Sequence, residues 1–334
     1  FLSAGGEQRL KDLDFDGDAD LITMPGGWNF PTDQSTLDDF ILEIAFNHST
    51  DSSGVANADQ AGRRFFNSEN DQVFKGGYFR DVVELSGAQS NYNISLSIDI
   101  TSITDRRMDG DGTDTLINVE LLDFESNLLE QPFDLRQVGG ATDLTTDEFE
   151  SLIELYIAYF NRAPDAVGLN FWGTAFAHGL SLDEIAAQFA PQPETVATYP
   201  EGTSNTEFAT AVYNNVLGRV PDQAGLEFWV GVLDAGAVSR DQFILEILRG
   251  VEAGTGDRTY LDNKVDVGAY FAEHKGMSDV EHATAVMKLF NGTESSIDQS
   301  ITAIDDYYEA ALDPENGEFL LQVVGVLDDP FGVA

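Results

Sequence analysis

The sequence predicts an α+β protein of more than one domain, in which a β-rich, calcium-binding N-terminal region precedes an all-α array of helical repeats. A change in composition and a change in the spacing of apolar residues indicate this division. Residues 1–140 are rich in Asp, Gly, Asn and Ser and hold short apolar or alternating runs, which are typical of strands. From Thr145 onwards, apolar residues recur at helical spacing as far as about Leu312. The length of 334 residues suits two or three domains.

The chain is strongly acidic. It has 59 Asp and Glu residues against 17 Lys and Arg residues, which gives a formal net charge of −42. Because this charge repels nucleic-acid phosphates and anionic lipids, we expect no nucleic-acid partner. The charge attracts cations, and it also keeps a protein soluble in salty water, so both interpretations stay open. The chain has no cysteine, which excludes disulfides and cysteine-ligated metals as stabilisers.

Apolar runs in the N-terminal region predict three strands, at residues 82–85, 92–103 and 116–124. One helix is predicted at residues 37–46, where apolar residues follow Thr36, a suitable N-cap. Residues 47–75 are polar and irregular, and we expect a loop there.

The clearest candidate for metal binding is an Asp-rich loop near the start of the chain. Carboxylates occupy every second position around Gly17, at Asp12, Asp14, Asp16, Asp18 and Asp20. Five carboxylates this close repel one another without a cation, and Ca²⁺ prefers six to eight oxygen ligands from such a loop. Thr23 stands where an EF-hand has its last glutamate, so the loop instead resembles the calcium loops of integrin-like propeller repeats. We expect calcium here; the alternative is an acidic turn without metal.

A second candidate consists of Asp109, Asp111 and Asp114, which alternate with Gly110 and Gly112. With the apolar run that follows, this segment resembles the closing segment of repeats-in-toxin calcium-binding domains. The resemblance implies a parallel β-roll in which calcium binds between stacked turns, with the three aspartates as ligands.

The same resemblance extends back along the chain and covers residues 72–135. Residues 76–83 have the spacing of one Gly-Gly-x-Gly-x-Asp turn, although Phe79 stands where the third glycine should be. The resemblance implies that Asp81 is a further calcium ligand. The alternative is that these turns connect strands and bind no metal.

The helical part contains an internal repeat. Residues 162–172 and 219–229 share Arg, Pro, Asp, Gly, Leu, Phe and Trp in register, at an offset of 57 (229 − 172 = 57). Pro164 cannot continue a helix, and Asp165 is suited to cap the next one. Arg162 is placed to pair with Asp165 or to donate to carbonyls at the end of the preceding helix. A corner that joins two helices is therefore favoured over a recognition site.

These two segments resemble a family of uncharacterised helical domains in large secreted bacterial proteins, and the resemblance covers residues 147–312. The helical part divides into two repeats at 145–256, a helical cap at 257–312 and a C-terminal tail at 313–334. Such domains accompany surface-layer proteins, adhesins and enzymes exported by type I secretion, whose signal is C-terminal and uncleaved. The tail is compatible with such a signal. Its apolar run is too short to span a bilayer, so no transmembrane segment is expected.

Motifs for catalysis are missing from the sequence. It has no G-x-S-x-G elbow, and none of its four histidines lies in an HExxH pattern. We predict a bacterial protein of the cell surface or extracellular space, of surface-layer or adhesin type, that folds with calcium after export and self-assembles or binds cell-surface glycan. Two alternatives remain, the accessory or catalytic part of a secreted hydrolase and a carbohydrate-binding module that uses Trp28 or Trp172.

Overall fold

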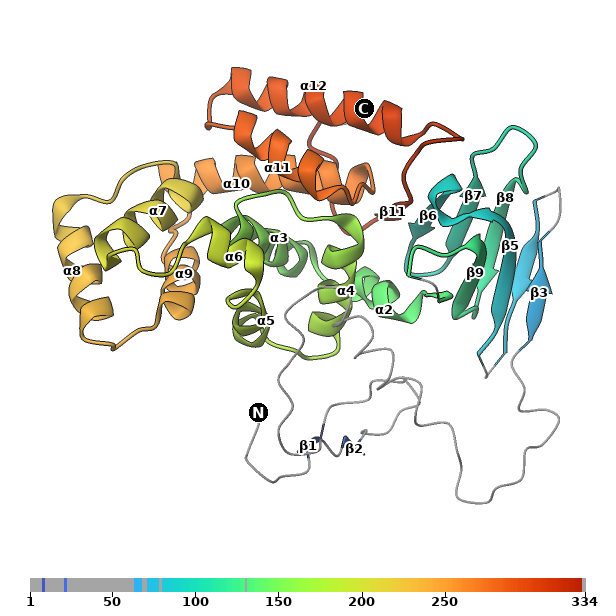
Figure 1. Ribbon diagram of the computed structural model, residues 1–334, viewed down its shortest axis with the longest axis horizontal. Helices are drawn as coiled ribbons and strands as arrows, with labels where there is room; N and C mark the ends of the chain where they lie inside the picture. Colours follow the sequence, from blue (N-terminus) through green and yellow to red (C-terminus); the bar gives the residue numbers. More distant parts are fainter. Residues whose placement is uncertain are drawn as a thin grey trace.

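The computed structural model describes residues 8–9, 21–22, 63–67, 71–77, 80–129 and 131–331. A β-rich region is followed by an array of helices, which confirms the predicted order of the two kinds of structure (Figure 1). The Asp-rich loop at residues 12–20, the helix predicted at 37–46 and Trp28 lie outside the described residues.

The strands form two larger sheets and one short ladder. In the ladder, β1 (Gln8–Arg9) pairs antiparallel with β2 (Leu21–Ile22). The four-stranded sheet has the order β10–β9–β5–β3, with β3 at Arg64–Phe66, β5 at Val82–Ala88, β9 at Leu121–Ser126 and β10 at Phe133–Asp134. The five-stranded sheet has the order β11–β6–β7–β8–β4, with β4 at Val73–Lys75, β6 at Tyr92–Leu96, β7 at Thr101–Asp105, β8 at Thr113–Ile117 and β11 at Leu320–Val323.

The chain coils between these two sheets. It passes from β3 in the first sheet to β4 in the second and back to β5, and it later crosses from β8 to β9 in the same way. Pairing along the coil is parallel: β3 with β5, β5 with β9, and β4 with β8. The hairpin β6–β7 is inserted into this coil and pairs antiparallel. We call this two-sheet unit the β-coil.

Two strand predictions and one loop prediction need correction. Residues 92–103 form two strands, because the backbone turns back between Ser97 and Ile100, where Ser97 N donates to the Ile100 carbonyl at 3.0 Å. Residues 116–124 also form parts of two strands, β8 and β9, separated by Asn118 with its positive φ of 50°. The segment 47–75, predicted as loop, contains β3 and β4; three residues are too few to give an alternating pattern.

Aromatic rings fill the space between the two sheets. Phe65 of β3 lies 5.5 Å from Phe74 of β4, and Tyr92 of β6 lies 5.2 Å from Phe124 of β9, measured between ring centroids. Along β6, the residues alternate between buried and half-buried, as expected for a strand with one face on a core. The two sheets therefore share one hydrophobic layer.

Helices make up most of the chain after residue 135. They are η2 (Gln89–Asn91) within the sheet region, then α2 (Arg136–Gly139), η3 (Gly140–Asp143), α3 (Thr146–Phe160), α4 (Ala166–Ala177), α5 (Leu182–Phe189), α6 (Pro193–Thr198), α7 (Asn205–Leu217), α8 (Gln223–Asp234), α9 (Arg240–Arg249), α10 (Gly256–Ala269), the π-helical η4 (Tyr270–His274), α11 (Val280–Leu289) and α12 (Glu294–Ala311). Capping boxes begin α3, α5 and α7, among others, at Thr145, Ser181 and Ser204. Helices α4 and α8 are related by the repeat offset at both ends (223 − 166 = 57 and 234 − 177 = 57).

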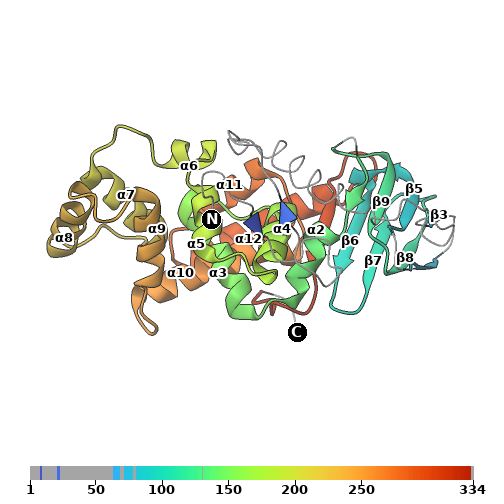
Figure 2. The ribbon, with the colours of Figure 1, turned by 90° about the horizontal axis from the view of Figure 1, so that it is seen from below.

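The C-terminal segment returns to the β-coil. Strand β11 pairs parallel with β6, and its Leu320 and Leu321 are fully buried. The buried apolar residues of the sheets and of the helices form one continuous cluster. Both ribbon views place the sheets at one end of the molecule and α7, α8 and α9 at the other (Figures 1 and 2). Among the helices that the structure describes, none has the length and hydropathy needed to cross a bilayer.

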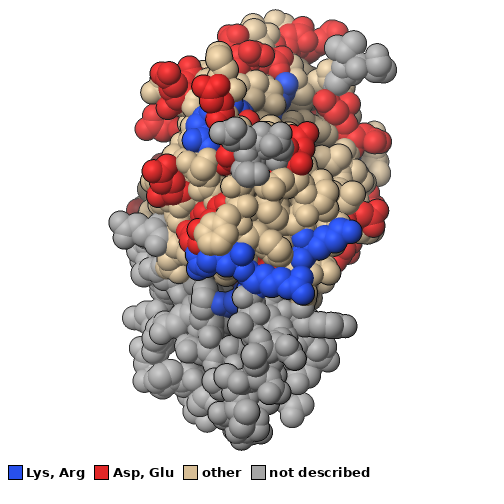
Figure 3. Space-filling view, turned by 90° about the vertical axis from the view of Figure 1, so that its right-hand side faces the viewer, with Lys and Arg blue, Asp and Glu red and all other residues tan. Residues whose placement is uncertain are grey.

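The free end of the β-coil is formed by its edge strands, β3 and β4. A row of basic atoms crosses this face, next to areas that are acidic or uncharged (Figure 3). Arg64 and Lys75 on these strands, and Arg63 just before β3, are exposed. Charged side chains on an edge strand disfavour pairing with another chain.

Candidate functional site

The predicted calcium ligands that the structure describes lie at the two edges of the β-coil, in turns or, for Asp114, at the start of strand β8. Strands β3, β4 and β5 begin nine residues apart (73 − 64 = 9 and 82 − 73 = 9). The middle residue of each three-residue strand, Phe65 and Phe74, and the matching Val83 point into the core. Each strand and the turn after it take nine residues, and successive strands lie in alternate sheets. Every second turn therefore lies on the same edge of the β-coil.

Asp81 fixes the turn at one edge. Its side chain is 1% exposed, and its two oxygens accept from the backbone N–H groups of Arg63 and Gly77. Its own N–H donates to Glu120 at 2.7 Å, in the next coil. A Cβ atom at Gly76 would lie 1.6 Å from the carbonyl oxygen of Asn118, so only glycine permits the stacked turns to come this close.

Asp114 has the corresponding position at the opposite edge. It is 1% exposed and accepts from the backbone N–H of Gln72 at 2.8 Å and from the side-chain amide of Asn67 at 2.6 Å. Asp71 in the same stacked turn accepts from the N–H of Thr113 at 2.9 Å. Burial raises the pKa of Asp114, and the charges of Asp111 and Asp71 raise it further. This edge therefore concentrates negative charge that a cation would relieve.

Asp111 lies on the same edge as Asp114, but it faces the inserted hairpin. It accepts from the Ser86 hydroxyl at 2.6 Å and from the Tyr92 hydroxyl at 3.2 Å, and Arg107 lies 3.8 Å away. Asp109 is exposed at the tip of the turn. The structure thus brings Asp111 and Asp114 to one edge and places Asp81 at the other.

Sequence reasoning missed Asp71 and Glu120, which join these turns. The signal that would have found them is the nine-residue register, because it aligns residue 72 with Asp114 and Asp81 with Glu120 once the strands are paired in parallel. It also missed a mixed group, Asp279, His282 and Glu318, whose members come from two segments far apart in the chain.

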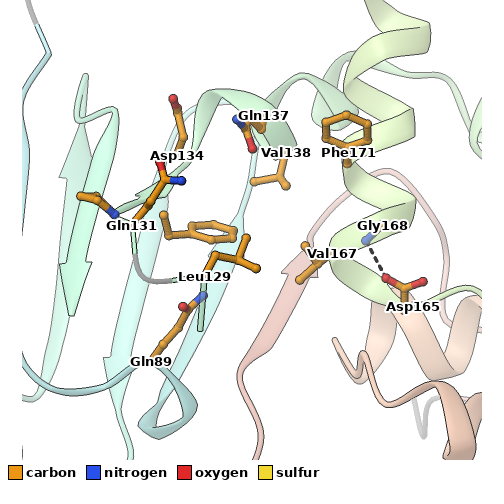
Figure 4. A pocket seen from close by; sticks show the side chains of 12 residues that line it. Gln89, Leu129, Gln131, Asp134, Gln137, Val138, Asp165, Val167, Gly168 and Phe171 are labelled. Atoms are coloured by element: carbon orange, nitrogen blue, oxygen red, sulfur yellow. Dashed lines mark hydrogen bonds between the residues drawn. The ribbon is translucent and has the colours of Figure 1, made fainter. Parts of the chain in front are cut away.

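The first Arg-x-Pro-Asp corner has the geometry of a structural joint. Asp165 caps α4 by accepting from the N–H of Gly168 at 2.8 Å, as drawn in Figure 4. Arg162 is 4% exposed, donates to the Ala163 carbonyl at 2.8 Å and lies 3.3 Å from Asp165. The predicted pairing with Asp165 is confirmed, whereas the carbonyl that Arg162 reaches lies beyond Asn161, the C-cap of α3, and not in the last turn of that helix. A Cβ atom at Gly168 would lie 2.7 Å from the Tyr156 hydroxyl, so glycine at this position permits α3 and α4 to approach closely.

The pocket beside this corner is small. Its walls come from α4, α2 and the sheet side of the molecule, and Phe171 and Gln137 are among its lining residues (Figure 4). Its volume of about 100 Å³ is below the roughly 300–1,000 Å³ of sites that enclose a small-molecule ligand. Trp172, suggested as a sugar-stacking residue, is 6% exposed and packs edge-on against Phe189 at 5.4 Å. It has no open face for a sugar ring.

Comparison with known proteins assigns part of the helical array. Residues 186–255 match a family described as a domain of unknown function (DUF4214). This segment runs from within α5 to the end of the second repeat. No curated protein and no solved structure matches the chain. The helical repeat is thus similar to a family without an assigned activity.

Proposed function

We propose that the chain is an extracellular, calcium-binding structural or interaction protein of the bacterial cell surface, of surface-layer or adhesin type. The observation that carries the proposal is the β-coil itself. Its parallel strands recur every nine residues, and its turns stack at two edges with buried aspartates at Asp81 and Asp114. This arrangement supports the resemblance to repeats-in-toxin domains and hence calcium as the ligand, with export by type I secretion.

Calcium has a physical role in such a coil. The edge with Asp71, Asp111 and Asp114 holds three carboxylates; burial raises the pKa of Asp114 there, and the charges of Asp111 and Asp71 raise it further. Ca²⁺ takes oxygen ligands from carboxylates and backbone carbonyls, both of which stacked turns supply. Binding to the folded state alone stabilises it, so folding follows the calcium concentration across the export step.

In this proposal the β-rich region and the helical array have different roles. The β-coil responds to calcium, and the helical array transmits that response because the two share one core through β11. The predicted loop at Asp12, Asp14, Asp16, Asp18 and Asp20 adds a second calcium site, and self-assembly or glycan binding follows once the coil is folded.

Calcium dependence is tested on the full chain. We expect the thermal midpoint to rise in millimolar Ca²⁺ and to fall in chelator. Asp114→Asn should reduce this calcium-dependent rise, whereas Asp298→Asn, an exposed position on α12, should not. Asp16→Asn tests the N-terminal loop separately. A midpoint that chelator leaves unchanged would contradict the proposal, because stabilisation of the folded state alone must appear as a shift.

Assembly is tested by light scattering during a calcium titration. Growth of ordered particles favours the surface-layer form of the proposal. A monomer at all calcium concentrations, together with binding on a glycan array, favours an adhesin. A calcium-bound monomer that binds no glycan would contradict both forms.

A further inference from the structure

Asp279, His282 and Glu318 bring one ligand atom each to within 4.8 Å of one another. Asp279 is the N-cap of α11, and His282 lies in the first turn of that helix. Glu318 lies in the segment that leads into β11. Two segments separated by α12 therefore meet at one point, and this point is remote in sequence from every predicted calcium ligand.

The spacing of these atoms suits a bound cation better than hydrogen bonds. Nδ1 of His282 lies 3.8 Å from Oδ1 of Asp279 and 3.5 Å from Oε1 of Glu318. Nδ1 is shielded from solvent and has no hydrogen-bond partner among the described residues. Ligands at about 2.0–2.2 Å from a tetrahedral ion lie roughly 3.3–3.6 Å from one another. The Asp279 and Glu318 oxygens lie within 4.8 Å of each other, so a bound ion would draw the carboxylates inward.

Two of the three side chains, and the backbone of Glu318, are held in place before any ion arrives. The ring of His282 stacks on Tyr307, with 3.9 Å between centroids and 9° between planes. Oδ1 of Asp279 accepts from the His282 N–H at 2.7 Å, and the Glu318 carbonyl accepts from Arg106 at 2.7 Å. Burial raises the pKa of the Glu318 carboxyl, and the charge of Asp279 raises it further.

We propose that Asp279, His282 and Glu318 form a site for a divalent transition cation of the zinc type, which clamps the C-terminal segment to α11. Imidazole nitrogen is a ligand for Zn²⁺ and its neighbours, whereas Ca²⁺ takes oxygen. Three protein ligands leave one position for water. The side chains are 28–39% exposed, so the ion enters directly from solvent.

The clamp acts on the strand that joins the two halves of the fold. Glu318 precedes β11 by two residues (320 − 318 = 2), and β11 pairs with β6 while it contacts η4 and α4. A cation at this site therefore links the helical cap to the edge of the five-stranded sheet. The proposal is independent of calcium binding in the β-coil.

A protonated His282 that forms ion pairs with the two carboxylates is the competing explanation. It requires no metal. Ion pairs of this kind contribute to stability whether or not zinc is present. A zinc site instead adds stability only when the ion is bound.

The test is isothermal titration of the full chain with Zn²⁺, in excess Ca²⁺ that occupies oxygen-only sites. His282→Phe keeps a ring on Tyr307 but removes the nitrogen, and Glu318→Gln keeps the size of the side chain. Glu281→Gln is the matched control, since Glu281 precedes His282 in the same turn but is outside the group. Circular dichroism verifies that each variant is folded.

We expect one equivalent of zinc to bind the parent chain and the control variant, and to raise their thermal midpoints. In His282→Phe and Glu318→Gln this equivalent should weaken by more than the roughly 10–100-fold that loss of an outer-shell partner causes. Equal zinc binding by all four proteins, or none by the parent chain, would overturn the proposal. A thermal midpoint that zinc does not change would also overturn it and would leave the ion pairs as the explanation.

Discussion

Arg162 and Arg219 begin the two copies of the same corner, and their surroundings differ. The side chain of Arg162 is 5% exposed and lies over the rings of Tyr156 and Phe160. It also pairs with Glu194 at 2.6 Å. The side chain of Arg219 is 44% exposed, lies over one ring and pairs with Asp257 at 2.6 Å. One motif thus forms a buried joint in the first copy and a surface joint in the second.

The apolar residues show the same contrast. Phe171 in the first copy is 8% exposed, and Phe228 at the equivalent position is 62% exposed. Helix α4 packs against α2, η3 and β11, whereas α8 lies at the far end of the molecule (Figures 1 and 2). Burial of the corner is therefore decided by the elements that cover it, which the repeat does not encode.

Local contacts are common to both copies. Asp165 and Asp222 accept from the glycine N–H three residues later, at 2.8 and 2.9 Å. Each tryptophan packs edge-on against a phenylalanine of the following helix, Trp172 against Phe189 and Trp229 against Phe243. The motif therefore specifies a capped turn and one aromatic contact, and it does not specify which other elements pack against the corner.

The largest expected difference between the copies is at the phenylalanine. Phe171→Ala should lower the free energy of unfolding by about 3–5 kcal/mol, since it opens a cavity beneath a buried ring. Phe228→Ala should change it by about 0.5 kcal/mol or less, because the ring is largely in water. Urea denaturation of both variants provides the comparison. Equal losses would mean that another surface covers α8 in solution.

The predictability of each feature follows the range of the interactions that create it. The caps at Asp165 and Ser181 and the repeat itself were predictable, because each depends on residues within one or two turns of helix. Strands β3 and β4 were not, since three residues carry no period. The position of β11 depends on pairing with β6, more than 200 residues earlier, and no local pattern records such a pairing.

The predictability of the candidate sites also depends on the range of the interactions that form them. The turns of Asp81 and Asp114 were predicted from a motif with fixed spacing, and the structure places both aspartates in stacked turns. The pairing of His282 with Glu318 joins two segments across α12 and leaves no spacing to recognise. The burial of Glu273 was equally unpredictable from the sequence, because a single glutamate in a helical run is typical of a surface residue.

The second expected difference concerns this buried carboxyl. Glu273 of η4 is 2% exposed, and Asn170 of the first copy donates to it at 3.1 Å. The second copy has Glu227, which is exposed, at the position of Asn170. Burial raises the pKa of Glu273 to about 8, from an ordinary value of 4.5.

The folded chain therefore holds a proton that the unfolded chain releases above about pH 4.5. Stability is highest when both states are protonated and falls as pH rises towards 8. Glu273→Gln removes this dependence, so its unfolding free energy relative to the parent should rise by on the order of 4 kcal/mol between pH 4.5 and 9. Glu227→Gln, at the exposed position equivalent to Asn170, is the matched control. Parallel pH profiles for the parent and Glu273→Gln would show that the carboxyl is ionised in the fold.

The smallest of the three differences is expected at the arginines. Arg162→Met keeps the apolar stem over the aromatic rings but leaves Asp165 and Glu194 without their cation, and we expect a loss of about 2 kcal/mol. Glu194 is 44% exposed and is partly solvated on its own, which keeps the loss below that of a fully buried pair. Arg219→Met should cost between about 0 and 1 kcal/mol, because its ion pair with Asp257 is in contact with water.

High salt offers the sharper measurement of this difference. It should reduce the effect of Arg219→Met and leave most of the effect of Arg162→Met, since buried charges are screened less. If salt reduced both effects equally, the buried corner would have to be open to solvent, and the contrast between the copies would not hold.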